Sequence, residues 1–410
     1  MVNAPEIADP QLYASGVPHD RFAAIRATPG LAWHPYGSNG FWVVARHEDA
    51  REVSRAPEVF SSAVGHTNLW DLEADALEAR RSLIDTDAPD HTRLRRLTAT
   101  AFTPKNVRKW ESVVRKITTE LLDAFVERGG GDWVELVSAP LPIRVILAML
   151  GVPLEDAAYL VELSNYLVEG TGDTQSIPPT AFGNTTELRL LPFNSPASHA
   201  LFEYGEKMRT MRTNDPADDI VTLLAQAEAD GDQLSSNEFK NLFHLLVFAG
   251  NETTRTALTH GAMAFAANPD QWQAVVDNPA LVESATEEVL RWATPVLHMR
   301  RTATVDTELA GTAIKAGDKV VMWYASTSFD ERAHVDPLRF DVRREANPHD
   351  AFGSGGPHHC LGAFLARLEI SVLFEEMAKR AIRLEQITDA VRTPSNFVHG
   401  VLSVGMAPVP

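Results

Sequence analysis

The sequence predicts a mainly α-helical protein with a minor β part. The first observation is an apolar pattern of helical spacing that continues from Ser235 to the helix-stopping pair Asn268-Pro269. The second is a pair of further helical patterns, from Pro104 to Phe125 and from Leu361 to Arg380. The third is that β-type residues gather in short runs bounded by turn residues. Helices therefore dominate the predicted fold.

The N-terminal region is predicted to be mixed. We expect residues 1–19 to form an extended arm. A short strand is predicted where Gly40-Phe-Trp-Val-Val44 follows the turn residues 37–40, and a helix from His47 to Arg55.

The middle of the chain is predicted to be helical with interruptions. The helix that starts at Pro104 must end before Gly129-Gly130-Gly131, because consecutive glycines stop helices. Beyond it we expect an apolar stretch punctuated by prolines at 134–150 and a helix at 151–174. A loose loop follows at 177–193, with Ile177-Pro-Pro179 and Leu190-Leu-Pro-Phe193, and helix resumes from Ser198.

The longest predicted helix has clear ends. Ser235 and Glu238 form a capping-box pattern at its start, and Pro269 follows its end. About 31 residues at 1.5 Å each give a rod of roughly 45–48 Å, long enough to cross a domain. Short strands are predicted after it, separated by glycine turns, at 304–309, 312–314 and 319–323.

Composition limits the class of protein. The chain has 410 residues with 44% hydrophobic and 22% charged side chains, as in ordinary globular proteins. A formal net charge of −18 argues against nucleic acid or an anionic membrane as partner.

No linker or repeat divides the chain, so one domain over 1–410 is predicted. The polar start, residues 1–10, and the lack of long apolar runs predict a cytoplasmic protein without a membrane anchor.

The single cysteine, Cys360, lies in the segment Phe352-Gly-Ser-Gly-Gly-Pro-His-His-Cys360-Leu-Gly362. A lone cysteine forms no intrachain disulfide and builds no zinc or iron–sulfur cage by itself. Glycines let the backbone approach a flat macrocycle, and the N-terminus of the following helix favours a thiolate. The segment therefore suits an axial ligand to haem iron. The alternative is a buried structural cysteine in a glycine-rich turn.

This segment resembles the ligand loop of cytochromes P450. The family pattern Phe-Gly-x-Gly-x-His-x-Cys-x-Gly is met by Phe352, Gly353, Gly355, His358, Cys360 and Gly362, with one extra residue between Phe352 and Cys360. The resemblance extends from about residue 20 to the C-terminus. It implies the P450 fold, with haem b between the long central helix and the helix after the cysteine. Cys360 would be the axial iron ligand, with Phe352 and Gly353 beside the haem.

A second motif lies in the middle of the long helix, in Ala249-Gly250-Asn251-Glu252-Thr253-Thr254. A glycine inside a helix costs about 1 kcal/mol relative to alanine. The Thr253 hydroxyl can bond back to the Ala249 carbonyl and open the helix into a groove for O₂ and water. The alternative is a tolerated glycine beside a core threonine. The segment matches the P450 oxygen-binding motif, which implies that Thr253 donates a hydrogen bond to the activated oxygen and that Glu252 contributes to the proton supply.

Haem would also need partners for its two propionates. The resemblance places His91 and Arg95, one helical turn apart, at two of these positions, and Arg301 and His358 at the others. Arg300 is adjacent to Arg301 and is an alternative.

A structural ion-pair network is implied as well. Glu288 and Arg291 share one helix face as Glu-x-x-Arg, and in the family this pair contacts a later arginine. Arg339 matches that position, and we predict a structural role for all three residues.

The acidic chain contains one basic segment, from Arg93 to Lys116, with eight basic residues and one acid, Glu111. It is either a solvated helix face or a docking surface for an acidic electron-transfer protein. Because the P450 redox partner binds on the cysteine side of the haem, we favour docking of a ferredoxin-type protein here.

The sequence therefore predicts a monomeric haem-thiolate monooxygenase that places one oxygen atom of O₂ into a C–H bond. Electrons must come from outside the chain, because it has no Gly-x-Gly-x-x-Gly fingerprint and no spare cysteines. The resemblance implies that they come from NAD(P)H through an external reductase and a ferredoxin. A peroxide-using enzyme and a haem-binding carrier or sensor are the alternatives. Glu252 with Thr253 argues against the first, and a carrier would not need Thr253.

The expected substrate is a hydrophobic small molecule. The motif sequences are similar to those of the bacterial P450 enzymes that act on steroids and branched lipids, which favours a sterol, terpenoid or alkyl chain. A small aromatic ether or phenol is the second candidate. The pocket walls expected by analogy are 64–72, 190–193, 243–249, 296–299 and 397–401, and they are mostly apolar. His66, Asn68, His298 and His399 are either orienting groups or solvent-facing loop residues.

Overall fold

A computed structural model describes residues 2–169, 187–229 and 231–409. The predictions for 170–174 and for Ile177-Pro178-Pro179 lie outside these residues. The helices are α1 (His19–Arg26), α2 (His47–Arg55), α3 (Ala74–Ala79), α4 (Asp90–Ala99), α5 (Pro104–Arg108), α6 (Glu111–Glu127), α7 (Pro140–Met149), α8 (Leu154–Glu169), α9 (Pro196–Asn214), α10 (Ile220–Ala225), α11 (Ser236–Ala267), α12 (Pro269–Asp277), α13 (Val282–Ala293), α14 (Tyr324–Thr327) and α15 (Ala363–Lys379).

The strands are short, which confirms the mainly α prediction. They are β1 (Val2–Asn3), β2 (Ala32–His34), β3 (Phe41–Val44), β4 (Phe60–Ser61), β5 (Gly131–Asp132), β6 (Glu228–Ala229), β7 (Asp232–Gln233), β8 (Met299–Ala303), β9 (Thr307–Leu309), β10 (Thr312–Ile314), β11 (Lys319–Met322), β12 (Arg383–Gln386), β13 (Val391–Arg392), β14 (Val401–Ser403) and β15 (Gly405–Val409).

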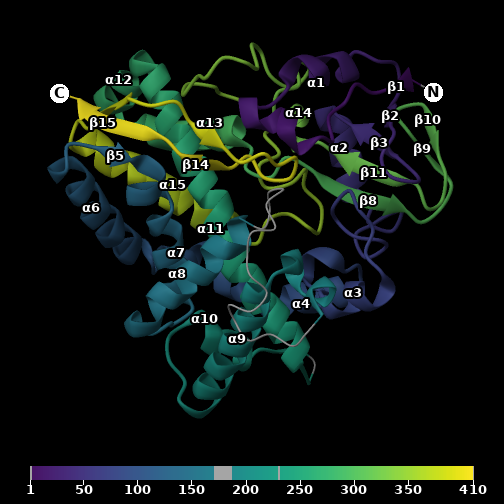
Figure 1. The fold of residues 1–410 in the computed structure, drawn as a ribbon, viewed down its shortest axis with the longest axis horizontal. Helices are drawn as coiled ribbons and strands as arrows, with labels where there is room; N and C mark the ends of the chain where they lie inside the picture. Colours follow the sequence, from purple (N-terminus) through teal and green to yellow (C-terminus); the bar gives the residue numbers. More distant parts are fainter. Residues whose placement is uncertain (1, 170–186, 230, 410) are drawn as a thin grey trace.

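The strands form a β region beside the helices. The main sheet has the order β1-β2-β3-β11-β8-β4, in which β11 pairs parallel with β3 and antiparallel with β8. It lies at the upper right of Figure 1, while a second sheet of β12, β15 and β5 lies at the upper left. The helices fill the left and lower parts of the same view.

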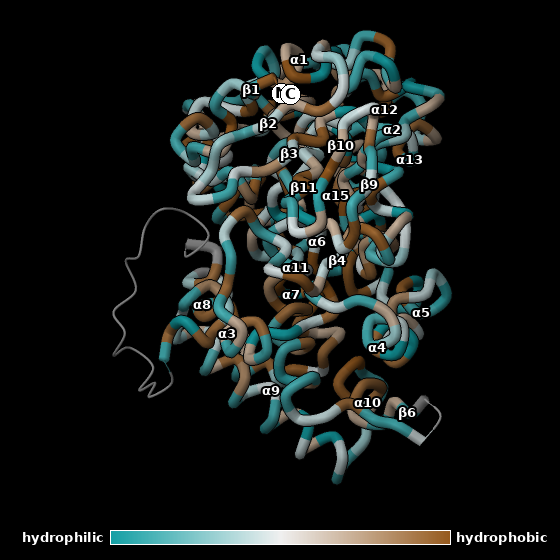
Figure 2. The backbone as a smooth tube through the Cα atoms, turned by 90° about the vertical axis from the view of Figure 1, so that its right-hand side faces the viewer, coloured by the Kyte–Doolittle hydropathy of each residue, from teal (hydrophilic) through white to brown (hydrophobic). Residues whose placement is uncertain are grey.

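Helix α11 is the axis of the helical part. Its 32 residues begin with the predicted capping box, in which Ser235 Oγ accepts from the Glu238 N–H and the Glu238 carboxylate accepts from the Ser235 N–H. It packs against α7, α9, α13 and α15. Figure 2 shows hydrophobic stretches gathered around α7, α11 and α15 and hydrophilic ones at the periphery. A helix buried on several sides forms a rigid platform for any residue that it carries.

Residues 2–18 do not form the extended arm that we predicted. β1 pairs with β2, and residues 10–15 form a short 3₁₀ helix. Ile7 and Tyr13 are buried, and the Tyr13 hydroxyl donates to the Ile7 carbonyl at 2.8 Å. Their apolar surface packs with Trp323 and other residues of the β region, which holds this segment on the protein.

The predicted helix over 104–125 is divided in two. α5 ends at Arg108 and α6 starts at Glu111, with a turn at residues 109–110 between them. Trp110 packs against the main hydrophobic core at this turn. The sequence pattern did not reveal this break between α5 and α6.

The ion-pair network around Glu288 corrects another prediction. Glu288 and Arg291 are fully buried and their charged groups lie 2.8 Å apart, as expected. The third arginine is Arg344, whose Nε lies 3.2 Å from Glu288 Oε2. Arg339 is exposed and contributes only its carbonyl oxygen, which accepts from Arg291 at 3.3 Å. Arg339 closes a turn that begins at Asp336, so its side chain lies on the outside, whereas Arg344 folds back onto Glu288.

Candidate active site

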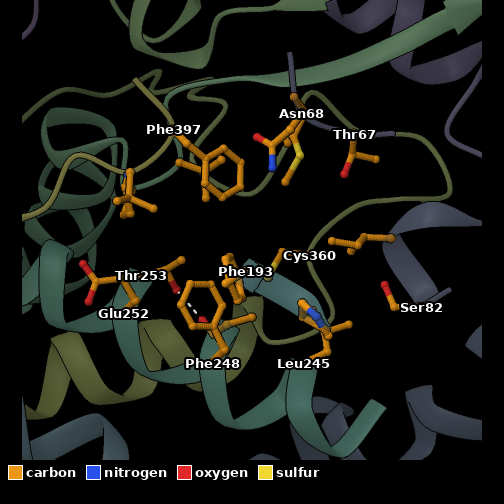
Figure 3. A pocket seen from close by; sticks show the side chains of 18 of the residues that line it. Thr67, Asn68, Ser82, Phe193, Leu245, Phe248, Glu252, Thr253, Cys360 and Phe397 are labelled. Carbon is orange, nitrogen blue, oxygen red and sulfur yellow. Dashed lines mark hydrogen bonds between the residues drawn. The ribbon is translucent and has the colours of Figure 1, made fainter. Parts of the chain in front are cut away.

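A cavity of about 1350 Å³ lies between α11, the loop before α15, and the β region (Figure 3). Apart from the alternative Arg300, its wall contains every residue that the sequence nominated for cofactor binding or catalysis. These are His91, Arg95, Ala249, Glu252, Thr253, Arg301, Phe352, Gly353, His358 and Cys360. Segments separated by up to about 270 positions therefore meet in one space.

The loop that carries Cys360 is held by backbone contacts. The Cys360 N–H donates to the Phe352 carbonyl at 3.0 Å. Gly356 has φ +74° and packs so closely that a Cβ there would lie 1.9 Å from the Ser54 carbonyl oxygen. Only glycine allows this approach. The tight loop places the sulfur three residues before α15, in the cavity wall.

The electrostatics at the sulfur call for a cation. Burial raises the pKa of the Cys360 thiol, and the Gly362 N–H, Arg95 and Arg367 lower it less strongly. The Gly362 N–H before α15 lowers the thiol pKa, the direction that the sequence predicted for this helix N-terminus, but burial outweighs it. A metal ion bound at the sulfur deprotonates a thiol outright. The donor thus fits an iron centre that supplies the missing positive charge.

A group of basic residues, two histidines and two arginines, lines the cavity near Cys360. The rings of His91 and His358 lie 4.1 Å apart, and Arg95 and Arg301 are the neighbouring charges. Burial together with Arg301, His91 and Arg95 lowers the pKa of His358 to about 2. Within the described ranges, neither Arg95 nor Arg301 has a carboxylate within 4.0 Å, and His91 Nε2 is enclosed without a hydrogen-bond partner. These residues fit a ligand that brings its own negative charges, as the two propionates of haem do.

The structure separates the two candidate arginines. Arg301 lies in the cavity wall, where its Nη1 donates to the Arg300 carbonyl at 2.8 Å. Arg300 does not line the cavity, and its Nη1 lies 2.7 Å from Asp71 Oδ1. The geometry therefore favours Arg301 as the residue near an anionic ligand.

The hydrogen bond that the sequence predicted for the α11 motif is present, and the helix continues through it without interruption. The Thr253 hydroxyl donates to the Ala249 carbonyl at 2.8 Å. Glu252 is 2% exposed, and its Oε2 has no hydrogen-bond partner in the part of the chain described. Burial raises the pKa of Glu252, and Arg255 opposes this, so the carboxyl group tends to hold its proton. Figure 3 shows Glu252 and Thr253 side by side on one helix at the edge of the space that Cys360 also lines.

The remaining wall is largely apolar. All five predicted wall segments contribute, among them through Trp70, Phe193, Phe248, Val296 and Phe397. His66 and Asn68 also line the cavity. His298 and His399 do not, because their Nδ1 atoms pair with the carbonyls of Asn396 and Ala293 at 2.9 and 2.6 Å.

Sequence reasoning missed several wall residues. Ala8 and Tyr36 reach the cavity from the N-terminal region, Ser82 and Asp85 from the segment before α4, and Glu369 from α15. No local pattern marks these residues. They reach the cavity only because the chain folds back on itself.

None of the helices within the described residues is both long and apolar enough to cross a membrane.

Known proteins resemble this chain over nearly its whole length. A family model described as cytochrome P450 matches residues 8–381. A steroid C26-monooxygenase from Rhodococcus jostii is 38% identical over 97% of this chain and 84% of that protein. A methyl-branched lipid omega-hydroxylase from Mycobacterium tuberculosis is 37% identical, over 93% and 88%.

Solved structures agree with these matches. A Mycobacterium marinum cytochrome P450 in complex with pseudoionone superposes with a TM-score of 0.88 at 34% identity. The alignment covers 99% of each chain.

Proposed function

The chain belongs to the cytochrome P450 family and is a monooxygenase, and from this premise we propose that it hydroxylates a sterol, terpenoid or alkyl chain. The 410 residues act as one domain in this proposal. The observation that carries it is the meeting of Cys360, the basic residues near it and the Thr253 motif around one mostly apolar cavity.

The residues that would hold haem b are those of the cavity wall. Cys360 would ligate the iron, with Phe352 and Gly353 beside it. His91, Arg95, Arg301 and His358 would pair with the propionates. Haem, when bound, supplies the activation of O₂ and the oxidation of the C–H bond.

The residues of α11 would manage protons. The Thr253 hydroxyl donates to the Ala249 carbonyl, and its oxygen can accept a hydrogen bond from a water molecule or an acid in the cavity. In the donor role that the motif implies, this hydroxyl would turn away from Ala249 toward the oxygen site. Glu252, whose pKa is raised by burial, would hold the next proton one residue away. The apolar wall would exclude bulk water.

The substrate class rests on the wall and on the relatives. The named relatives act on a steroid and on methyl-branched lipids. Apolar residues from five separate segments offer this chain's own guest a hydrophobic surface. A small aromatic ether or phenol is the second candidate.

Electrons would come from NAD(P)H through a reductase and a ferredoxin. Lys105, Arg108 and Lys109 are exposed and have no ion-pair partner within the described ranges. Arg93 and Arg115 are paired with acids, and Arg95 faces the cavity. Within the basic segment from Arg93 to Lys116, we therefore propose α5 and its end as the centre of the docking surface. A cytoplasmic location and a monomeric state stay predictions of the sequence.

The first test is the absorption spectrum of the reduced, CO-bound holoprotein. The red-shifted Soret band of a thiolate-ligated haem is expected in the wild type and should be lost in Cys360→Ser. A wild-type protein that is folded and loaded with haem, yet lacks this band, would overturn the proposal. Haem binding without substrate oxidation in the presence of NAD(P)H, reductase and ferredoxin would instead favour a carrier or sensor.

A further inference from the structure

His244 brings a polar group into the apolar wall formed by α11. It is 4% exposed and lines the cavity. It precedes Thr253 by nine residues, which is roughly 13 Å along the helix axis. Figure 3 shows the neighbouring Leu245 and Thr253 at opposite ends of the segment of α11 that faces the cavity. His244 therefore lies at the far end of the wall from the predicted oxygen site.

The hydrogen bonds around His244 fix its protonation state. The Ser198 hydroxyl lies 2.7 Å from the Pro192 carbonyl oxygen, which can only accept, so the hydroxyl proton points there. The Ser198 oxygen lies 3.0 Å from His244 Nε2 and must accept from it. Burial lowers the pKa of His244 to about 3, so the ring is neutral near pH 7. The proton is therefore on Nε2, and Nδ1 is an acceptor.

The ring has little freedom to turn. It lies 6.0 Å from the Phe193 ring in a stacked arrangement and 5.6 Å from the Phe202 ring edge-on. Nδ1 makes no hydrogen bond within the described residues, and it is not among the nitrogens that protein atoms enclose completely. An oriented acceptor is thus available to a guest in the cavity.

Asn241, one turn earlier on α11, offers a second acceptor. Its Nδ2 lies 3.2 Å from the Ala79 carbonyl and 3.1 Å from the Asn237 carbonyl. Only the NH₂ group can donate to two carbonyls, so Oδ1 is the atom left for other partners. Asn241 also lines the cavity. Two neighbouring groups on this wall therefore accept hydrogen bonds.

We propose that this end of the cavity selects a substrate with a hydroxyl group, which donates to His244 Nδ1 while the carbon to be oxidised lies near Thr253. The inference rests on the proposed function, in which the cavity holds the substrate. A ketone or an ether at the same position has no proton to donate and would leave the acceptors unpaired. His244 is a specificity residue in this proposal, and Ser198 is a positioning residue that fixes its tautomer.

The test compares three ligands with one skeleton: cholestan-3β-ol, cholestan-3-one and 3β-methoxycholestane. Their dissociation constants for the haem-loaded protein are measured by calorimetry. The wild type should bind the alcohol roughly tenfold more tightly than the ether, because one neutral hydrogen bond changes the dissociation constant by about this factor. The ratio should fall below about twofold in His244→Phe, which keeps a ring of similar size. In Ser198→Ala the ring can change tautomer, and the preference for the alcohol over the ketone should shrink.

Phe248→Leu is the matched control, because it removes apolar contact without touching an acceptor. It should weaken all three ligands alike. Equal binding of alcohol, ketone and ether by the wild type would overturn the inference, as would an unchanged ratio in His244→Phe or a failure of the alcohol to bind. The CO-bound spectrum of the same samples reports the haem-thiolate centre independently, so failure of the proposed function would be recognised separately.

Discussion

Arg300 and Arg301 are adjacent in sequence, but the structure gives them different surroundings. Arg300 pairs with Asp71 at 2.7 Å, whereas Arg301 lies in the cavity wall without a carboxylate partner among the described residues. Both residues belong to β8, and successive side chains of a strand point to opposite faces. Because side chains alternate along β8, Arg300 points to the ion pair with Asp71 and Arg301 points to the cavity.

Arg301→Gln should weaken haem retention. Loss of a cation next to a propionate removes a charge-assisted hydrogen bond of about 1.5–3 kcal/mol, so haem should dissociate at least tenfold faster. Transfer of haem to apomyoglobin measures this rate. Arg300→Gln is the control and should retain haem at the wild-type rate. Equal rates of loss in the two variants would contradict the assignment.

Arg344→Met should destabilise the fold. Arg344 donates to buried Glu288 and to the Arg339 carbonyl at 2.9 Å. Its removal should lower the free energy of unfolding by about 1.5–3 kcal/mol, as measured in urea. Arg339→Met, at an exposed position of the same loop, should change it by less than about 0.5 kcal/mol. A larger loss of unfolding free energy in Arg339→Met than in Arg344→Met would support Arg339 as the third arginine of the network.

Thr253→Ala should uncouple electron consumption from product formation. The variant loses the hydroxyl that bonds to Ala249 and keeps every residue proposed to hold haem, so the absorption spectrum should not change. Product formed per NAD(P)H consumed should fall by about tenfold or more, with peroxide or water formed instead. Thr253→Ser keeps a hydroxyl and should retain most of the coupling. Full coupling in the alanine variant would exclude a role for the hydroxyl.

Buried histidines should make the protein sensitive to acid. The pKa of His298 falls from 6.5 to about 4 because of burial. Between these values the unfolded chain binds a proton that the folded chain does not. The contribution of neutral His298 to stability is therefore fully present above pH 6.5 and is lost as the pH falls towards 4. One such group removes about 1.4 kcal/mol of unfolding free energy per pH unit.

His298→Asn keeps a donor for the Asn396 carbonyl but does not titrate. The slope of unfolding free energy against pH, measured in urea at pH 7, 6 and 5, should therefore be shallower in this variant by about one proton. Parallel slopes for variant and wild type would show that the pKa of His298 is the same in the folded and the unfolded chain, which would contradict this prediction.

Charge reversal on α5 should slow reduction by an acidic ferredoxin. Lys105→Glu and Lys109→Glu remove unpaired, exposed cations, and each should reduce the rate about tenfold at low salt. The difference should shrink at high ionic strength, because screening weakens exposed charges. Lys315→Glu is the control with the same change in net charge, at an exposed lysine paired with Asp306 on the far β hairpin. Stopped-flow reduction rates that are equal in all variants would exclude docking on this surface.

Local chemistry made parts of the site predictable from sequence. The capping box and Pro269 define the ends of α11, because helix ends are decided by the residues at those ends. The Thr253–Ala249 bond follows from a spacing of four within one helix. The Cys360 loop is recognisable for the same reason, since its glycines and ligand lie within eleven residues.

Contacts between distant segments were not predictable in this way. The choice of Arg344 over Arg339 depends on how a loop folds back onto α13, and the orientation of His244 depends on Ser198, 46 positions earlier. Burial of residues 2–18 depends on Trp323. The sequence by itself determined the ends of α11, the cysteine loop and the polar motif of α11, because each depends on neighbours along the chain. Tertiary structure alone decided which charges are paired, which nitrogen of His244 is free and which residues share the cavity, because packing sets desolvation and hydrogen-bond partners only after distant segments meet.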